Sequence, residues 1–178
     1  MPKLSYHRAL NLASLRRLPV VFVCENNGFA TTMRVRDTTA GSITGRAEAF
    51  GVPASTVDGQ DPEVVLAAAS TAVQRARAGD GPSFLECLTY RFDAHHTWEH
   101  SVRPRYRTDE EVATGRGRDP VAIQAARVPA DVRERIDAEI EALLDEAERF
   151  VHASPEPDPA GALDHLYAAG NLGRAGVA

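Results

Sequence analysis

An uninterrupted apolar run, VVFVC at residues 20–24, sets the first limit on the fold of this chain. It consists of β-branched and aromatic residues and follows Pro19, which ends any preceding helix. Such a run is typical of a strand that is covered on both faces, as in a parallel sheet. A second run, SFLECLTYRF at residues 83–92, has the same character. We therefore predict a parallel sheet that contains both segments.

Helical patterns alternate with the two predicted strands. Asp61 is suited to cap a helix and Pro62 to occupy its first position, so a helix is predicted from there to about residue 78. The alternation of helix and strand is typical of a doubly wound α/β domain. The other elements predicted in this part are a helix over 6–17, a loop over 28–42, a helix over 43–50 and an extended segment over 52–59.

The rest of the chain predicts helices only. The sequence Thr108-Asp-Glu-Glu has the form of a capping box, and DPVAIQAARV follows it as a further helix. Residues 130–152 carry apolar side chains on one helical face and predict the longest helix. We therefore predict two domains, an α/β portion over 1–128 and a helical extension over 129–178.

Composition narrows the class of protein. The net charge is −5 with acids and bases interspersed, so no basic face for nucleic acid is expected. No apolar run approaches the ~18 residues that a membrane-spanning helix needs, and the first residues lack the pattern of a signal peptide. Cys24 and Cys87 lie within apolar runs and are expected to be reduced. These features predict a soluble, cytoplasmic protein.

The first predicted strand ends on Asn26, Asn27 and Gly28, at the edge of a parallel sheet where ligands bind. A carboxamide oxygen is a neutral, hard ligand that suits Mg²⁺, which takes six oxygens at ~2.1 Å. Gly28 would allow a sharp turn, so that the carbonyl of Phe29 also faces the ion. Asn and Gly are equally typical of a plain turn, and from these residues alone both interpretations remain open.

The longer string LNLASLRRLPVVFVCENNGFA, residues 10–30, resembles the second half of the thiamine-diphosphate motif in a known family. This is the alpha subunit of the first component of 2-oxo acid dehydrogenases, of the pyruvate, branched-chain and acetoin types. The motifs VDG-x-D at 57–61 and TYR-x-x-x-H at 89–95 follow in the family's order and spacing. The resemblance runs to about residue 170. It implies a thiamine-diphosphate-binding α/β fold that is incomplete at its N-terminus.

The resemblance also implies roles for individual residues. Asn27, through its side-chain oxygen, and Phe29, through its main-chain carbonyl, would bind the Mg²⁺ that bridges the diphosphate of thiamine diphosphate. His95 would lie near the cofactor, handle protons there and help to acylate the lipoyl group, a task for which imidazole is suited near neutral pH. Arg91 would contact the cofactor region and fix the loop. If the alignment slips by one residue, His96 takes the role of His95.

The first half of the family motif begins with Gly-Asp-Gly, and no such triplet precedes Asn27. The triplet at Gly79–Gly81 follows a predicted helix and fits a helix end and turn. We therefore expect this chain alone to bind thiamine diphosphate and Mg²⁺ poorly. A separate N-terminal chain, a truncation and a decayed remnant all remain open as explanations.

By resemblance, the function is the oxidative decarboxylation of a 2-oxo acid with acyl transfer to a lipoyl group. It would require a beta subunit, the lipoyl-bearing acyltransferase and the Gly-Asp-Gly segment. One alternative is a non-catalytic remnant or assembly partner of the same fold. A weaker alternative is a transketolase-like half-subunit, although TYR-x-x-x-H together with RYRT favours the oxo-acid branch.

Overall fold

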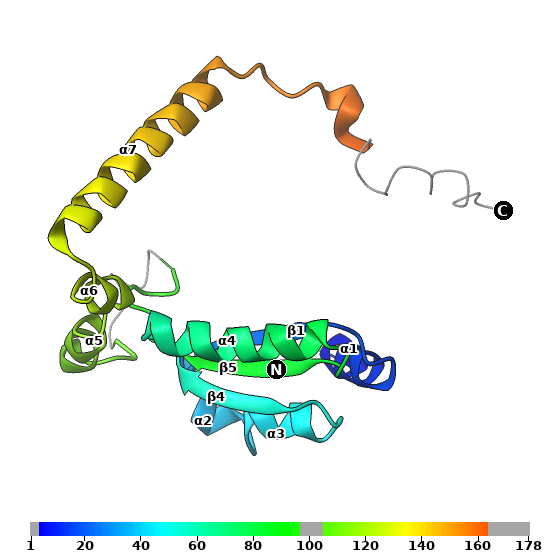
Figure 1. Cartoon of the computed structure of the whole chain (residues 1–178). Coiled ribbons are helices and arrows are strands. Elements are labelled where there is room, and N and C mark those ends of the chain that lie inside the picture. The colour runs from blue at the N-terminus through cyan, green and yellow to red at the C-terminus, as the bar shows by residue number, and fades with distance from the viewer. Residues whose placement is uncertain (1–3, 97–104, 164–178) are drawn as a thin grey trace. The chain divides into compact units, whose positions relative to one another are not determined.

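The computed structural model describes residues 4–96 and 105–163, and the chain divides into two units, Met1–Pro129 and Ala130–Ala178. The first unit holds a three-stranded sheet with the order β1-β5-β4 (Figure 1). Its strands are β1 (Val21–Asn26), β5 (Ser83–Leu88) and β4 (Ala54–Asp58).

All three strands are parallel, and their carboxyl ends are level. Asn26 pairs with Leu88 across β1 and β5, and Asp58 pairs with Leu88 across β4 and β5. The segments that leave β1, β4 and β5 therefore start from the same edge of the sheet. The predicted α/β fold with a parallel sheet is confirmed.

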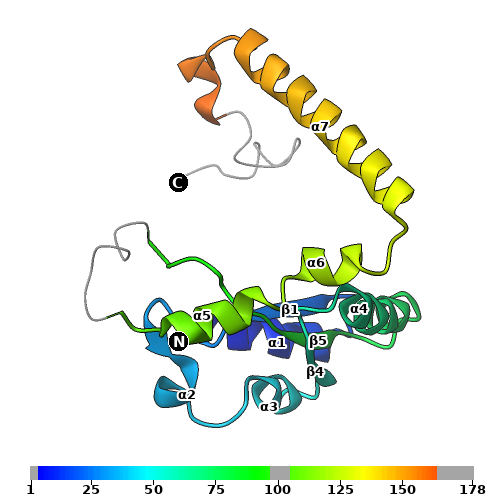
Figure 2. The ribbon, with the colours of Figure 1, turned by 90° about the vertical axis from the view of Figure 1, so that its left-hand side faces the viewer.

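Helices cover both faces of this sheet. Helices α1 (Leu4–Leu15) and α3 (Ile43–Glu48) share a core with the sheet, and Figure 1 shows α4 (Pro62–Arg77) on the side opposite α3. Figure 2 shows the same arrangement from a second direction, with α3 beside β4 and α4 beside β5. The buried residues at the centre of this core are Leu10, Ala47, Val52 and Phe84.

The strands differ in burial. β5 is buried from Ser83 to Cys87, as expected for a strand covered on both faces. The same expectation is wrong for β1, where Val23 is 60% exposed, because β1 lies at one end of the three-strand order within the described residues. β5 also ends at Leu88 and not at Phe92. Beyond that end the Tyr90 amide donates to the side chain of Gln60, at 3.2 Å.

The segment 28–42 was predicted to be a loop, but it contains a small hairpin and one helical turn. The hairpin consists of β2 (Phe29–Ala30) and β3 (Met33–Arg34), which pair antiparallel, and α2 (Val35–Thr38) follows directly. Two-residue strands are too short to produce a periodic pattern, so the sequence does not reveal them. The hairpin places the residues that follow Asn27 beside the carboxyl edge of the sheet.

Two short helices end the first unit, α5 (Asp109–Arg116) and α6 (Pro120–Ala125). Thr108 caps α5, because its hydroxyl accepts from the amide of Glu111 at 3.1 Å. The predicted capping box is wrong in its second hydrogen bond, which the Thr108 amide would donate to the Glu111 side chain. The Glu111 carboxylate does not return to the cap but pairs with Arg34, at 2.6 Å.

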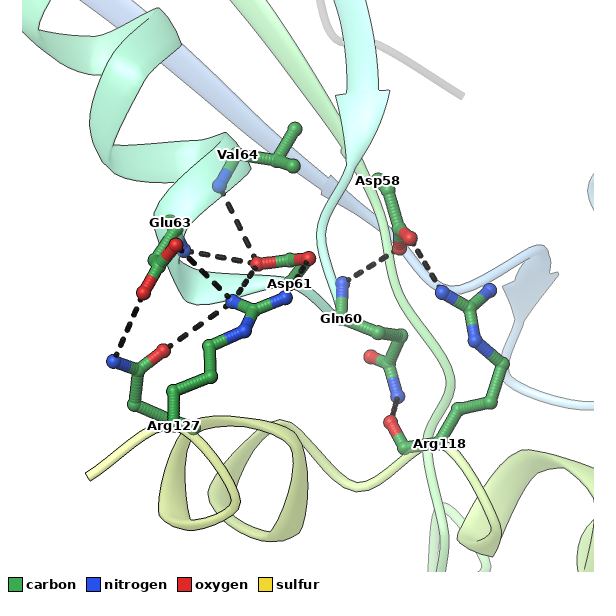
Figure 3. Close-up of polar contacts among 8 residues, drawn as sticks. Asp58, Gln60, Asp61, Glu63, Val64, Arg118 and Arg127 are labelled. Atoms are coloured by element: carbon green, nitrogen blue, oxygen red, sulfur yellow. Dashed lines mark hydrogen bonds and ion pairs between the residues drawn. The ribbon is translucent and has the colours of Figure 1, made fainter. Parts of the chain in front are cut away.

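The start of α4 matches the sequence prediction and is also joined to the segment that follows α6. Asp61 accepts from the Glu63 amide at 3.0 Å, and the two terminal guanidinium nitrogens of Arg127 donate to its carboxylate, each at 2.7 Å (Figure 3). The Arg127 guanidinium holds the pKa of the Asp61 carboxyl well below its usual range. Nearby, Arg118 forms an ion pair with Asp58.

The second unit contains α7 (Ala130–Ala153) and a short 3₁₀ helix, η2 (Pro159–Leu163). The apolar face expected on the long helix is present, but no residue of α7 is buried. Across the described ranges, none of the helices has the length and hydropathy that crossing a bilayer requires. The exposed large apolar residues of α7 are Ile136, Ile140, Leu143, Leu144, Phe150 and Val151.

Candidate functional site

The asparagine pair forms a tight turn where β1 ends. The Asn26 side-chain oxygen accepts from the Gly28 amide, and that of Asn27 accepts from the Phe29 amide, each at 3.0 Å. Gly28 has a φ of +75°, a left-handed conformation that glycine adopts at no steric cost. The turn continues into the hairpin, where the Val35 amide donates to the Gly28 carbonyl at 2.9 Å. Each carboxamide oxygen retains a second lone pair for a further partner.

A buried carboxylate holds this turn from inside the sheet. Glu86 on β5 is 7% exposed. It accepts from the Asn26 side-chain amide at 2.7 Å and from the Thr56 hydroxyl at 2.8 Å. Glu86 thus joins all three strands, because Asn26 belongs to β1 and Thr56 to β4. A buried carboxylate with two donors is satisfied, so this contact fixes the position of Asn26.

Both thiols lie on the strands that form this edge. Cys24 and Cys87 are free, as the sequence predicts. Burial raises the pKa of each thiol, and the charge of Glu86 raises that of Cys24 further. Neither thiol is therefore activated as a nucleophile.

The turn opens into a cavity of about 480 Å³ in which charges of both signs meet. Arg34 pairs with Glu111 at 2.6 Å, and its guanidinium lies 4.9 Å from the centre of the Phe29 ring. Arg36 also lines the cavity. The remaining lining residues are Asn26, Asn27, Gly28, Val35, Thr39, Gly41, Ser42, Ile43, Glu86 and Tyr90.

These residues fit a metal–diphosphate pair better than a bare metal ion. Among residues 4–96 and 105–163 no group of His, Cys, Asp and Glu side chains could by itself hold a metal. A cation at the turn would therefore rest on neutral oxygens, such as the Asn27 carboxamide and main-chain carbonyls. A diphosphate would bring the missing negative charge, and the guanidinium groups of Arg34 and Arg36 suit phosphate oxygens.

The segment after β5 brings Arg91 and His95 to the hairpin. Arg91 donates to the Thr31 carbonyl at 2.9 Å and to the Tyr106 hydroxyl at 2.7 Å, and another of its nitrogens lies 3.0 Å from Nδ1 of His95. Because a guanidinium can only donate, this contact requires the His95 tautomer in which Nδ1 accepts and the ring proton is on Nε2. His96 lies beside His95, with 4.4 Å between the ring centroids.

Several residues at this site escaped the sequence analysis. Glu86 could have been identified from the sequence, since a single carboxylate inside an apolar strand needs hydrogen-bond donors. The sequence does not indicate the roles of Arg34, Tyr106 and Arg107, because their contacts depend on how distant segments fold together. Arg107 is 8% exposed and lies among the rings of Phe29, Tyr90 and Tyr106.

The Gly-Asp-Gly triplet at 79–81 lies away from this site. The Gly79 amide donates to the Ala76 carbonyl at 3.1 Å, and Gly79 and Gly81 both have positive φ. The triplet forms the turn after α4 and precedes the amino end of β5, whereas Asn26 ends β1 at the opposite edge. Its interpretation as a helix end is confirmed.

A second cavity, of about 800 Å³, adjoins the first and shares Tyr90 and Glu111 with it. The Tyr90 ring packs against Gly115 of α5, where a Cβ would lie 2.1 Å from Tyr90 Cδ1. The Tyr90 hydroxyl and Nε of Arg91 are buried without a hydrogen-bond partner among the described residues.

Comparison with known proteins decides the family. The model of the dehydrogenase E1 component matches residues 5–160. The chain belongs to the dehydrogenase E1 component family. The resemblance to an alpha subunit is thereby confirmed, and the matches correspond to part of such a subunit.

The similar proteins are alpha subunits with several named activities. The chain is 37% identical over 171 residues to the acetoin:2,6-dichlorophenolindophenol oxidoreductase alpha subunit of Cupriavidus necator, covering 92% of this chain and 50% of that protein. It is 32% identical over 170 residues to the 2-oxoisovalerate dehydrogenase alpha subunit of Bacillus subtilis, with 92% and 51% covered. It is 35% identical over 160 residues to the pyruvate dehydrogenase E1 alpha subunit of Rhizobium meliloti, with 85% and 45% covered. The chain thus spans about half the length of these relatives.

Proposed function

We propose that this dehydrogenase E1 family chain is part of the alpha subunit of a thiamine-diphosphate-dependent 2-oxo acid dehydrogenase, which carries out oxidative decarboxylation. The observation that carries the proposal is the Asn26–Gly28 turn at the carboxyl edge of the sheet, open to a cavity of about 480 Å³ with two guanidinium groups in its lining. The family match supports the assignment of this oxygen-rich turn to a metal–diphosphate site. The family match also favours the oxo-acid branch over the transketolase-like alternative.

In this proposal Asn27 and Phe29 hold Mg²⁺ through the carboxamide oxygen and the main-chain carbonyl. Arg34 and Arg36 face the diphosphate. When bound, thiamine diphosphate supplies an electron sink for the decarboxylation of a 2-oxo acid. Glu86 keeps Asn26, and with it the turn, in place through the 2.7 Å bond from the Asn26 amide.

His95 is proposed to handle protons beside the cofactor. Its Nε2 carries the proton while Nδ1 accepts from Arg91 at 3.0 Å, so Nε2 is the atom that can donate. Arg91 orients the ring and connects it to the hairpin through the Thr31 carbonyl. His96 would take this role if the family alignment slips by one residue.

The proposed activity needs more than the residues of this chain. A beta subunit would complete the cofactor site, a Gly-Asp-Gly segment would supply the acidic metal ligand, and a lipoyl-bearing acyltransferase would accept the acyl group. The coverage of about half of each relative supports a proposal in which further sequence takes part. That sequence could be present in the same subunit or in a separate N-terminal chain.

The test is an activity assay on the chain co-expressed with a beta subunit and the completing segment. Reduction of 2,6-dichlorophenolindophenol is followed with pyruvate, 2-oxoisovalerate and acetoin, the compounds named by the relatives. We expect activity with pyruvate or 2-oxoisovalerate, whereas activity with acetoin alone, which has no carboxyl group to lose, would contradict the decarboxylation of a 2-oxo acid. The His95→Gln variant should lose ~10²–10⁴-fold in kcat, as for loss of a general acid–base group, and the same loss in His96→Gln, with His95→Gln near wild type, would assign the role to His96 instead. No activity in the complete assembly would favour the non-catalytic alternative.

A further inference from the structure

One ion pair joins the hairpin after β1 to helix α5 beside the candidate site. Nη2 of Arg34 on β3 donates to the carboxylate of Glu111 on α5 at 2.6 Å, and both residues line the cavity of about 480 Å³. The two side chains are only 32% and 26% exposed, so water weakens this pair less than a fully exposed one. Glu111 therefore fixes where the positive charge of Arg34 lies in this cavity.

The charges that line the cavity are balanced. Arg34 and Arg36 bring two positive charges, and Glu86 and Glu111 bring two negative charges. A lining without net charge attracts a polyanion poorly, because each guanidinium is offset by a carboxylate. A diphosphate group that binds Arg34 would also lie beside the like charge of Glu111. Tight binding of a polyanion therefore requires one carboxylate to move away.

The two carboxylates differ in how firmly they are held. Glu86 is 7% exposed and accepts from Asn26 and Thr56, so its movement would leave two donors unpaired inside the sheet. The Glu111 carboxylate has one partner, Arg34, in the part of the chain that the structure describes. Glu111 also lines the neighbouring cavity of about 800 Å³, so a displaced carboxylate has space there. Glu111 is therefore the carboxylate that can move.

Arg34 has the donors that an anion needs. A guanidinium carries five N–H donors, and among the described residues only Nη2 of Arg34 has a hydrogen-bond partner. Its planar fork suits two oxygens of one phosphate group, just as it suits a carboxylate. Exchange of the Glu111 carboxylate for phosphate oxygens would therefore leave this cation paired.

We propose that Glu111 is an internal competitor for the anion site, whose carboxylate pairs with Arg34 until a diphosphate group displaces it. Displacement also breaks the ion pair between β3 and α5, so anion binding removes this link between the hairpin and the helix. The identity of the anion as the diphosphate of the cofactor rests on the proposed function. The competition itself is a property of Arg34 and Glu111, and it can be measured with inorganic diphosphate alone.

An NMR titration of the full chain with inorganic diphosphate tests the competition. Glu111→Gln keeps the size of the side chain and the amide that donates to Thr108, but it removes the carboxylate that competes for Arg34. The affinity for inorganic diphosphate should rise by about 3- to 10-fold. The matched control is Glu110→Gln, which removes the same charge from an exposed side chain that lines the second cavity and not the first. Its affinity should stay within about twofold of wild type.

Carboxylate ¹³C NMR follows the displacement in the wild-type chain, without reliance on a variant's affinity. The Cδ signal of Glu111 is assigned through Glu111→Gln, and the Nε signal of Arg34 through Arg34→Lys. Both signals should shift during the titration with the same midpoint, because one exchange moves both groups. The Cδ signal of Glu110 should stay in place.

Each contrary result has a distinct meaning. Anion binding that leaves the Glu111 signal unchanged, or that is no tighter in Glu111→Gln than in Glu110→Gln, would overturn the competition and leave the proposed function standing. Absence of binding in wild type and Glu111→Gln alike would overturn the competition and also count against a diphosphate at Arg34. Competition with inorganic diphosphate, together with no binding of thiamine diphosphate in the complete assembly, would count against the proposed function alone.

Discussion

Glu86 shows how a single residue can organise the carboxyl edge of the sheet. It is the one buried acid on β5, and donors from the strands on both sides point to it. Such a carboxylate stabilises the fold only while both donors remain, because an unpaired buried polar group costs about 1–3 kcal/mol.

Substitutions at Glu86 should therefore distinguish the effect of its hydrogen bonds on stability from the effect of its side-chain volume. In Glu86→Met the Asn26 amide loses its acceptor, and the free energy of unfolding should fall by about 1–3 kcal/mol. In Glu86→Gln the loss should be smaller, because the new carboxamide oxygen can accept from Asn26 while the Thr56 hydroxyl rotates to accept from its NH₂ group. Urea denaturation measures both. A Met variant as stable as wild type would contradict the account.

At the scale of residues, sequence reasoning found those whose surroundings are local. Asn27 and Gly28 were identified because they end an apolar run, and the structure places them in a tight turn at the sheet edge. Arg107 could not be identified. Its burial depends on rings and carbonyls from separate segments, and nothing in the string RYRT distinguishes it from the exposed Arg105.

Among the elements, the start of α4 carries a pH-dependent contact. Arg127 of the segment after α6 holds the pKa of Asp61 well below its usual range, mainly through their hydrogen bonds. The folded state therefore gains stability from this group at pH values above the ordinary carboxyl pKa of ~3.9, and loses it as the pH falls toward the folded pKa.

The variant Asp61→Asn keeps an oxygen that can cap α4 but removes the charge. It should be less stable than wild type near neutral pH, and the difference should shrink as the pH is lowered below ~4. Urea midpoints measured across this range test the prediction. In an Arg127→Met background the same substitution should have less effect near neutral pH. A difference that stays constant with pH in the presence of Arg127 would refute this explanation.

Helix α5 depends on a glycine for its contact with Tyr90. A Cβ at Gly115 would lie 2.1 Å from Cδ1 and 2.4 Å from Cε1 of that ring, so Gly115→Ala should force the two apart. Overpacking of this kind costs about 1–3 kcal/mol. The control Gly117→Ala has a helical φ of −64° and a nearest atom at 3.4 Å, so it should be neutral or slightly stabilising. Thermal unfolding of both variants would show the difference, and equal effects would contradict it.

The elements that the sequence predicted correctly are those whose own residues include a helix cap or a buried apolar run. Asp61-Pro62 marked the start of α4, and Thr108 marked that of α5. The hairpin over Phe29–Arg34 was missed, because its pairing depends on the turn at Gly28 and not on a periodic pattern. The exposure of β1 was missed as well, since an apolar run alone does not show a strand's place in the sheet.

At the scale of the whole molecule, the family match and the structure establish different things. Membership in the dehydrogenase E1 component family covers residues 5–160. The core of the first unit comes from its own helices and strands, centred on Leu10, Ala47, Val52 and Phe84. The division into domains at 1–128 and 129–178, and the roles of the site residues, stay predictions.

Isothermal titration calorimetry with thiamine diphosphate, with and without Mg²⁺, tests the central claim most directly. The chain is titrated alone and in its assembly with the completing segment and beta subunit, as wild type, as Asn27→Ala and as the control Asn11→Ala on an exposed position of α1. We predict Mg²⁺-dependent binding in the assembly, weakened by ~10–100-fold or more in Asn27→Ala and unchanged in Asn11→Ala. Binding that needs no Mg²⁺, or that is as tight in Asn27→Ala as in wild type, would contradict a metal–diphosphate site at this turn.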